Sequence, residues 1–268
     1  MKNFQFNITY DCNLACKWCN RLCGTEFDKP STNMSIELMR KYSHIIYDHI
    51  EPLSRIAITG GEPTLHPQFF DILDIAANIL RSKMKIPILI LSNGVGEKVN
   101  SILSEVRKRY TTLDSPTPEI SPNDFVLHMS TKKQTEQFYI VCSKNRNTSL
   151  FVSQMHKPIF RAAIDFFPKK EDFYKTCWVT GVCGYDLTPY GIFACTAAPV
   201  AISTIFKLDA LRFDHFPTEE EAERQLKQLC KYCSVPCQQI LSPIISPTYE
   251  KQLQEWRNDP FFLDTLEI

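Results

Sequence analysis

The feature that most constrains this chain is a group of three closely spaced cysteines, Cys12, Cys16 and Cys19. The group follows residues 4–10, whose alternating apolar and polar side chains indicate a β-strand. Thiolates are soft ligands that suit iron–sulfur clusters or zinc. A four-iron cluster normally takes four cysteines, so three would leave one iron open to a small-molecule ligand. Cys23 is near enough in sequence to be a fourth ligand, although we expect it to be a bystander.

The chain has eleven cysteines and equal numbers of basic and acidic residues, 30 of each. Because no signal peptide or long apolar segment is apparent, we expect a cytoplasmic protein without a membrane span. Clustered cysteines in a reducing compartment indicate metal binding or redox chemistry rather than disulfides. The charge balance argues against a broad nucleic-acid surface.

Candidate strands and helices alternate along the first part of the chain, which predicts a parallel sheet. Expected helices begin after Ser35 and at Pro67, and a third passes through Val99. The candidate strands share β-rich or alternating patterns and span residues 4–10, 55–59, 86–91, 125–129, 138–141 and 159–166. This part is too short for a closed eight-stranded barrel, so about six strand–helix units are expected.

The character of the sequence changes near residue 170, where we place a domain boundary. We expect an α/β domain over residues 1–170 and a small cysteine-rich domain, with C-terminal helices, over residues 171–268. Thr218 and Glu221 have the spacing of a capping box, so a helix should start there and end near Cys230.

Two further polar turns end expected strands. The first is Gly60-Gly61-Glu62-Pro63, in which the glycines allow close approach of a ligand and the Glu62 carboxylate accepts hydrogen bonds. The second is Ser92-Asn93-Gly94, which equally fits a simple turn. Such turns lie at the carboxyl ends of parallel strands, where α/β proteins place their ligand sites. We expect His66 to order the first of these loops or to line the pocket.

The spacing C-x3-C-x2-C, with Trp18 just before the third cysteine, resembles the radical S-adenosylmethionine superfamily. The resemblance implies a partial (β/α)6 TIM-like barrel and a [4Fe–4S] cluster on the three cysteines. The open iron would bind the amino and carboxylate groups of S-adenosylmethionine, which is cleaved reductively to methionine and a 5′-deoxyadenosyl radical. An electron donor such as flavodoxin or ferredoxin is then expected. The residues implied to contact the cofactor are Trp18, Gly60, Gly61, Glu62, Pro63, Ser92, Asn93 and Ser130.

A second group of six cysteines lies between Cys177 and Cys237. A predicted hairpin through Gly191 ends at Cys195, and a C-x2-C pair, Cys230 and Cys233, follows the expected helix. A hairpin pair of cysteines with this C-x2-C pair provides four thiolates, enough for a closed cluster, although a zinc site has the same signature.

This second group resembles the auxiliary-cluster domains called SPASM and, in a shorter form, twitch. The resemblance to the twitch form implies a second [4Fe–4S] cluster on Cys177, Cys195, Cys230 and Cys233. Cys183 or Cys237 is an alternative ligand or a hydrogen donor to a substrate radical. The interval from Gly191 to Cys195 is one residue shorter than the common family pattern, which leaves the hairpin detail open.

The resulting hypothesis is a radical enzyme acting on a natural-product or peptide substrate by oxidation, epimerisation or crosslinking. Its auxiliary cluster would accept or conduct an electron. An RNA-modifying or activase-type member of the same superfamily is an alternative. A zinc-binding interaction protein without catalysis is the non-enzyme alternative, with Cys23 or a distant cysteine completing the first site.

Overall fold

A computed structural model describes residues 2–14, 21, 23, 33–114, 137–142, 173–208, 212–233, 251 and 255 of the 268-residue chain. Within this part, seven strands form one sheet in the order β4-β5-β3-β2-β1-β6-β7. All neighbouring pairs are parallel except β6 and β7, which form an antiparallel hairpin. The strands are β1 (Phe4–Asn7), β2 (Ile56–Thr59), β3 (Ile88–Ser92), β4 (Thr112–Asp114), β5 (Phe138–Cys142), β6 (Tyr185–Thr188) and β7 (Gly191–Phe193).

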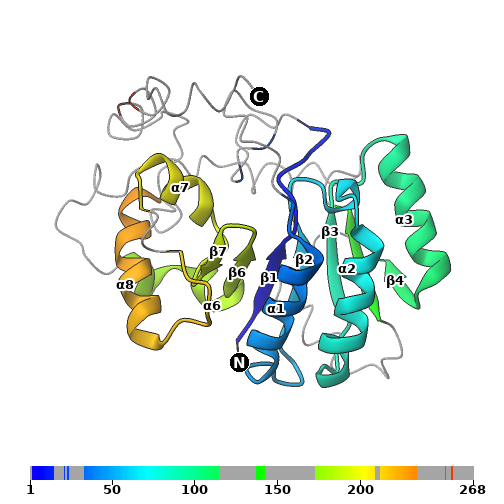
Figure 1. Cartoon of the computed structure of the whole chain (residues 1–268), viewed down its shortest axis with the longest axis horizontal. Coiled ribbons are helices and arrows are strands. Elements are labelled where there is room, and N and C mark those ends of the chain that lie inside the picture. Colours follow the sequence, from blue (N-terminus) through cyan, green and yellow to red (C-terminus); the bar gives the residue numbers. More distant parts are fainter. Residues whose placement is uncertain are drawn as a thin grey trace.

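Among the described α-helices, three cover one face of the parallel strands and three more lie between residues 173 and 233 (Figure 1). The first set is α1 (Ile36–Tyr47), α2 (Phe69–Ile75) and α3 (Glu97–Arg109). The second set is α6 (Trp178–Val182), α7 (Pro199–Ile205) and α8 (Glu219–Leu229). Among the described residues, no helix has the length and apolar content needed to cross a membrane.

The core beneath α1, α2 and α3 is built from one side of each strand. Phe6, Ile58 and Ile90 are paired in register on β1, β2 and β3, and each is 0% exposed. Because side chains alternate along a strand, the residues between them point to the opposite face, which is more polar. There Asp186 is paired with Gln5, and burial raises the pKa of Asp186 to about 7 against the lowering effect of the Arg21 charge.

The described elements agree with most of the sequence predictions. Ser35 caps α1 through its side chain, as expected, and the hairpin through Gly191 is present. The helix expected from Pro67 begins two residues later, at Phe69. The expected strands at 125–129 and 159–166 lie outside the described residues. Chain order does not give strand order throughout, because β5 lies between β3 and β4.

The segment after residue 170 continues the sheet of the first part, since β6 pairs with β1. Gly184, just before β6, has a φ of +76°, and a Cβ there would collide with the backbone of Asn3. Asn3 in turn donates from Nδ2 to the carbonyl oxygen of Val182, at 2.8 Å. The division at residue 170 therefore marks a change in sequence character across a continuous sheet, and a two-domain organisation stays a prediction.

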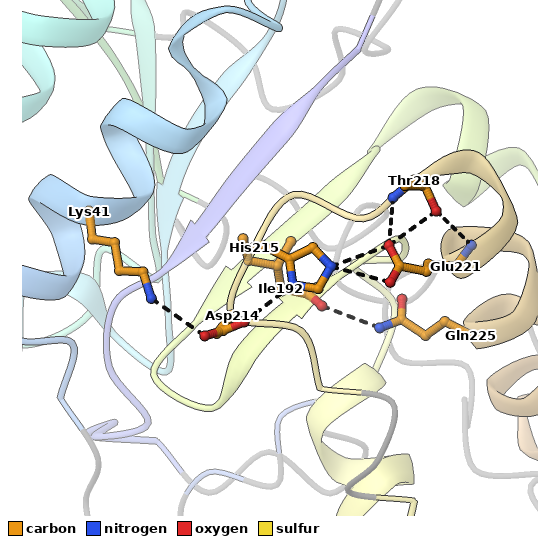
Figure 2. Close-up of polar contacts among 7 residues, drawn as sticks. All are labelled: Lys41, Ile192, Asp214, His215, Thr218, Glu221 and Gln225. Carbon is orange, nitrogen blue, oxygen red and sulfur yellow. Dashed lines mark hydrogen bonds and ion pairs between the residues drawn. The ribbon is translucent and has the colours of Figure 1, made fainter.

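A network of exposed charges joins the loop before α8 to α1 (Figure 2). Lys41 on α1 approaches Asp214 at 3.8 Å, and His215 lies 3.2 Å from both Asp214 and Glu221. Glu221 also accepts from the backbone N–H of Thr218 at 2.9 Å, which completes the predicted capping box of α8. Hydrogen bonds to the carboxylates of Asp214 and Glu221 raise the pKa of His215.

We predict that replacing His215 with Gln lowers stability in a pH-dependent way. Because the folded state raises the pKa of His215, its contribution is complete below the unfolded pKa, about 6.5, and is lost as pH rises through the folded pKa. Urea unfolding should therefore give a larger deficit for His215→Gln at about pH 5.5 than at about pH 8.5. His44→Gln, at an exposed position on α1, is the control. An equal deficit at both pH values would contradict the prediction.

Candidate functional site

The turn after β2 packs directly against the chain that leads from β1 to Cys12. The backbone N–H of Gly61 donates to Thr9 O at 2.8 Å, and that of Glu62 donates to Asp11 O at 2.7 Å. A Cβ at Gly60 would lie 2.6 Å from Thr9 O, and one at Gly61 would collide with the backbone of Asp11. The two glycines are therefore required by the close approach of these two backbone segments.

The carboxylate of Glu62 joins the carboxyl ends of β2 and β3. Oε1 accepts from Thr64 N at 3.2 Å, from Thr64 Oγ1 at 2.7 Å and from Ser92 Oγ at 2.9 Å. Oε2 accepts from Asn93 N at 2.7 Å. Glu62 is 0% exposed, so these bonds are protected from water. A carboxylate offers about four lone-pair sites, and the four donors found among the described residues match that number.

The side chain of Asn93 links this arrangement to the first cysteine. Its Nδ2 donates to Asn13 Oδ1 at 2.8 Å and lies 3.9 Å from Cys12 Sγ. Its Oδ1 accepts from Val95 N at 2.7 Å, and Asn13 Nδ2 donates to Val95 O at 2.7 Å. The cysteine-bearing loop is thus fastened to the end of β3 by side-chain amides.

The structure gathers one part of the residues that the sequence indicated and leaves the others undescribed. Those gathered at the carboxyl edge of the sheet are Cys12, Gly60, Gly61, Glu62, Pro63, Ser92 and Asn93. Those outside the described residues are Cys16, Trp18, Cys19 and Ser130. The binding of a cofactor by the residues of either group stays a prediction.

His66 orders the loop after the glycine turn, one of the two roles considered from the sequence. It is 3% exposed, with Nε2 located 2.9 Å from Met34 O and Nδ1 accepting from Gln68 N at 3.0 Å. Burial lowers its pKa. The imidazole is consistent with a neutral ring that donates from Nε2, which leaves neither nitrogen for a ligand.

Sequence reasoning missed two residues at this edge. Asn13 was not singled out, because an asparagine between two cysteines carries no pattern of its own. Cys142 ends β5 in register with Ser92, and a Cβ on Gly94 would lie 2.8 Å from the Cys142 Cβ. Cys142 is partly exposed and reaches the edge because β5 is the direct neighbour of β3.

The four cysteines expected to form an auxiliary site line one small apolar cavity. Cys177 is the N-cap of α6, and Cys195 lies in the chain after β7. Cys230 begins the short 3-10 helix that follows α8, and Cys233 is the C-cap of that helix. The residues that line the cavity are Cys177, Thr180, Cys195, Ala197, Ala198, Pro199, Ile202, Leu229, Cys230 and Cys233. Cys183 is absent from this lining, and Cys237 lies outside the described residues.

The environment of these thiols opposes negative charge. Burial raises the pKa of Cys177, Cys195 and Cys230, and neighbouring cysteines raise it further. The cysteine with the largest such effect is Cys233 for Cys195, and Cys195 for Cys230. A bound metal reverses this balance because it deprotonates a coordinating thiol. The donor set therefore fits a metal-containing group that supplies positive charge.

The arrangement of the described donor side chains bears on whether the bound group is one zinc ion or a four-iron cluster. Within the described ranges, no three His, Cys, Asp or Glu side chains are arranged to hold a single metal ion. Four thiolates around one zinc ion would each lie about 2.3 Å from it, whereas a four-iron cluster distributes its ligands over four separate metal atoms. The choice between a cluster and a zinc ion at the four cysteines therefore stays a prediction.

Helix α8 holds the two halves of this cysteine cavity together. Gln225, 0% exposed, accepts from Ala194 N through Oε1 at 2.6 Å. Its Nε2 donates to Ile192 O at 3.2 Å (Figure 2). Ala194 precedes Cys195, and Cys230 is the C-cap of the same helix. Gln225 therefore sets the distance between β7 and the C-x2-C pair.

One apolar cluster of side chains connects the two cysteine regions. Tyr10 is buried in it, and its ring meets that of Tyr190 edge-on with centroids 5.5 Å apart. Cys12 and Cys195 pack against the same cluster. The chain that leads to the first cysteine and the auxiliary cavity are thus parts of one packed region.

Comparison with known proteins gives one family match. The family model of the Radical SAM superfamily matches residues 6–142, about half of the chain. No curated protein matches.

Solved structures show distant similarity. BtrN in complex with AdoMet and 2-DOIA has 14% identity and a TM-score of 0.42, and covers 91% of this chain and 96% of its own. Native anSMEcpe with bound AdoMet has 16% identity and a TM-score of 0.40, and covers 99% and 100%. These TM-scores are low, and they define neither the site nor the substrate.

We predict that Glu62→Gln destabilises the protein by about 1–3 kcal/mol, because the new amide group faces buried donors that lose their acceptor. Urea unfolding of the metal-free chain measures this change. Glu220→Gln, at an exposed position on α8, should change stability by less than about 0.5 kcal/mol. Equal effects of the two substitutions would contradict the role assigned to the Glu62 carboxylate.

We also predict that Gln225→Leu loosens the cysteine cavity. The substitution leaves Ala194 N and Ile192 O buried without partners, at a cost of about 1–3 kcal/mol each. In the metal-free chain, alkylation of Cys195 and Cys230, followed by mass spectrometry, should become several-fold faster. Gln228→Leu, on the same helix and partly exposed, is the matched control. Unchanged alkylation rates in Gln225→Leu would contradict the prediction.

Proposed function

Because the chain belongs to the radical SAM superfamily, we propose that it cleaves S-adenosylmethionine and abstracts a hydrogen atom from a natural-product or peptide substrate. The matched residues, 6–142, include the three cysteines of the amino-terminal motif. Family membership implies a [4Fe–4S] cluster and S-adenosylmethionine as cofactors. When bound, they supply the 5′-deoxyadenosyl radical and methionine through one-electron cleavage of the sulfonium.

The protein contributes ligands, alignment and exclusion of water. Cys12, Cys16 and Cys19 are the proposed cluster ligands, and the contacts around Asn93 hold the first of them against β3. The negative charge of the Glu62 carboxylate is suited to the ammonium group of the methionine moiety. Gly60 and Gly61 allow the turn that carries Glu62 to pack against the backbone of Thr9 and Asp11. Of the other residues implied by the resemblance, Trp18, Pro63, Ser92 and Ser130 complete the proposed cofactor contacts.

We propose a second [4Fe–4S] cluster on Cys177, Cys195, Cys230 and Cys233, as in a SPASM- or twitch-like domain. The single observation that supports it is their convergence on one apolar cavity. A cluster there would accept an electron from the substrate radical, or conduct one, which favours an oxidation over a reaction without net electron loss. A flavodoxin- or ferredoxin-type donor would supply the electron for the first cluster.

The test begins with anaerobic purification and counts of iron, sulfide and zinc. The wild-type chain should contain about eight irons, as two four-iron clusters require, and should release 5′-deoxyadenosine when reduced with S-adenosylmethionine. The triple variant Cys12→Ala, Cys16→Ala and Cys19→Ala should lose that product and about half of the iron. Zinc in place of iron, or product formation by the triple variant, would overturn the proposal.

The auxiliary cluster is tested separately. The double variant Cys230→Ala and Cys233→Ala should lose about four irons while still cleaving S-adenosylmethionine. The matched variant Cys142→Ala, at the end of β5, should keep the full iron content. If the double variant retains about eight irons, the four cysteines are not the ligands of a second cluster.

A further inference from the structure

We propose that Asn93 is a positioning residue for the cluster at Cys12, because its side-chain amide donates toward Cys12 Sγ and so raises the reduction potential of that cluster. This inference rests on the proposed function and adds to it a residue that controls the electron-transfer step. The observation that carries it is the fixed orientation of the Asn93 amide between β3 and the cysteine loop.

Hydrogen bonds determine which end of the Asn93 amide faces the sulfur. Asn93 Oδ1 accepts from the backbone N–H of Val95 at 2.7 Å, so a flipped amide would place two donors against each other. Asn13 is fixed in the same way, since its Nδ2 donates to Val95 O at 2.7 Å. Its Oδ1 consequently faces Asn93 and accepts from Nδ2 at 2.8 Å. The amide nitrogen of Asn93 is therefore the group 3.9 Å from Cys12 Sγ.

The two hydrogens of the Asn93 amide have two acceptors available. One hydrogen is directed to Asn13 Oδ1, and the other is left for Cys12 Sγ. At 3.9 Å the contact with sulfur is long for a hydrogen bond to a neutral thiol. A thiolate with a bound cluster is a stronger acceptor, because hydrogen bonds to charged groups are shorter and stronger.

The donor is held by the sheet rather than by the loop that it contacts. Asn93 is 6% exposed and follows β3 directly, and its own backbone N–H donates to the buried Glu62 carboxylate at 2.7 Å. An amide fixed in this way undergoes little reorganisation when the charge of its neighbour changes. Asn93 itself is buried, which strengthens the electrostatic effect of its amide.

The sign of the effect follows from the charge change. Reduction adds one electron to the cluster and makes its sulfur ligands more negative. A donor aimed at such a sulfur stabilises the reduced state more than the oxidised state, and hydrogen bonds to cluster sulfurs are among the determinants of the potential. Loss of the Asn93 amide should therefore make the cluster harder to reduce.

The test is a redox titration of the anaerobically reconstituted full chain, followed by electron paramagnetic resonance. The signal to follow is the one that changes when S-adenosylmethionine is added, which separates this cluster from the auxiliary one. Asn93→Ala should lower the equilibrium constant of reduction about threefold to tenfold, where tenfold is about 59 mV for one electron. Asn93→Asp should shift it at least as far in the same direction, because it replaces the donor with a carboxylate.

Asn93→Asp keeps the test interpretable if the alanine variant misfolds, because aspartate is nearly isosteric with asparagine and keeps an acceptor for Val95 N. Asn33→Ala is the matched control. Asn33 accepts from Thr9 Oγ1 at 2.5 Å and donates to Asp11 at 3.5 Å, so it fastens the same chain without an amide directed at Cys12. In Asn33→Ala, the equilibrium constant of cluster reduction should stay within about twofold of the wild-type value. This change is well below the effect expected from losing the Asn93 hydrogen bond to the charged Cys12 thiolate.

The outcomes separate this inference from the proposed function. Wild-type values in both Asn93 variants, at equal iron content, would overturn the inference alone. A shift in Asn33→Ala as large as that in Asn93→Ala would also overturn it, because loop geometry rather than the amide would then set the potential. Absence of any signal in the wild type that responds to S-adenosylmethionine would overturn the proposed function and this inference together.

Discussion

The buried Glu62 carboxylate is the interaction on which the arrangement of the site depends. Three parallel strands end at the same edge of the sheet, and backbone hydrogen bonds hold the turn after β2 against the chain after β1. The Glu62 carboxylate adds the end of β3, because one oxygen accepts from Ser92 and Thr64 and the other from the backbone of Asn93. Through Asn93 and Asn13 the same set of bonds reaches Cys12. The position of the first cysteine is thereby tied to the ends of β2 and β3.

The auxiliary cavity depends on a different kind of support. Burial in apolar surroundings raises the pKa of Cys177, Cys195 and Cys230, so these thiols would have to lose protons to bind a metal. Gln225 keeps β7 and α8 at a fixed separation, and the charge network around Asp214 and His215 joins the loop before α8 to α1. Metal loading and folding of this region should consequently be coupled, as is usual when thiolate ligands must lose their protons.

Sequence patterns predicted those features that depend on local chemistry. The caps at Ser35 and Thr218 and the hairpin at Gly191 each follow from residues a few positions apart, and the structure contains all three. The two glycines of the turn after β2 were predicted to allow close approach of a ligand. In the structure, the segment that approaches them closely is the backbone of Thr9 and Asp11.

Features that depend on distant segments could not be predicted in the same way. The insertion of β5 between β3 and β4 places Cys142 beside Gly94, and nothing in the local sequence indicates that order. Gln225 resembles any helical glutamine until its partners on β7 are known. Convergence of the four auxiliary cysteines likewise required the packing of α6, α7 and α8.

The central claim is that three cysteines hold a cluster whose remaining iron binds S-adenosylmethionine. Electron–nuclear double resonance on the reduced protein, with S-adenosylmethionine carrying 15N in its amino group and 17O in its carboxylate, tests this directly. The account predicts hyperfine couplings from both labels, which require direct bonds to a cluster iron. A reduced four-iron cluster that shows neither coupling while the labelled compound is bound would contradict it.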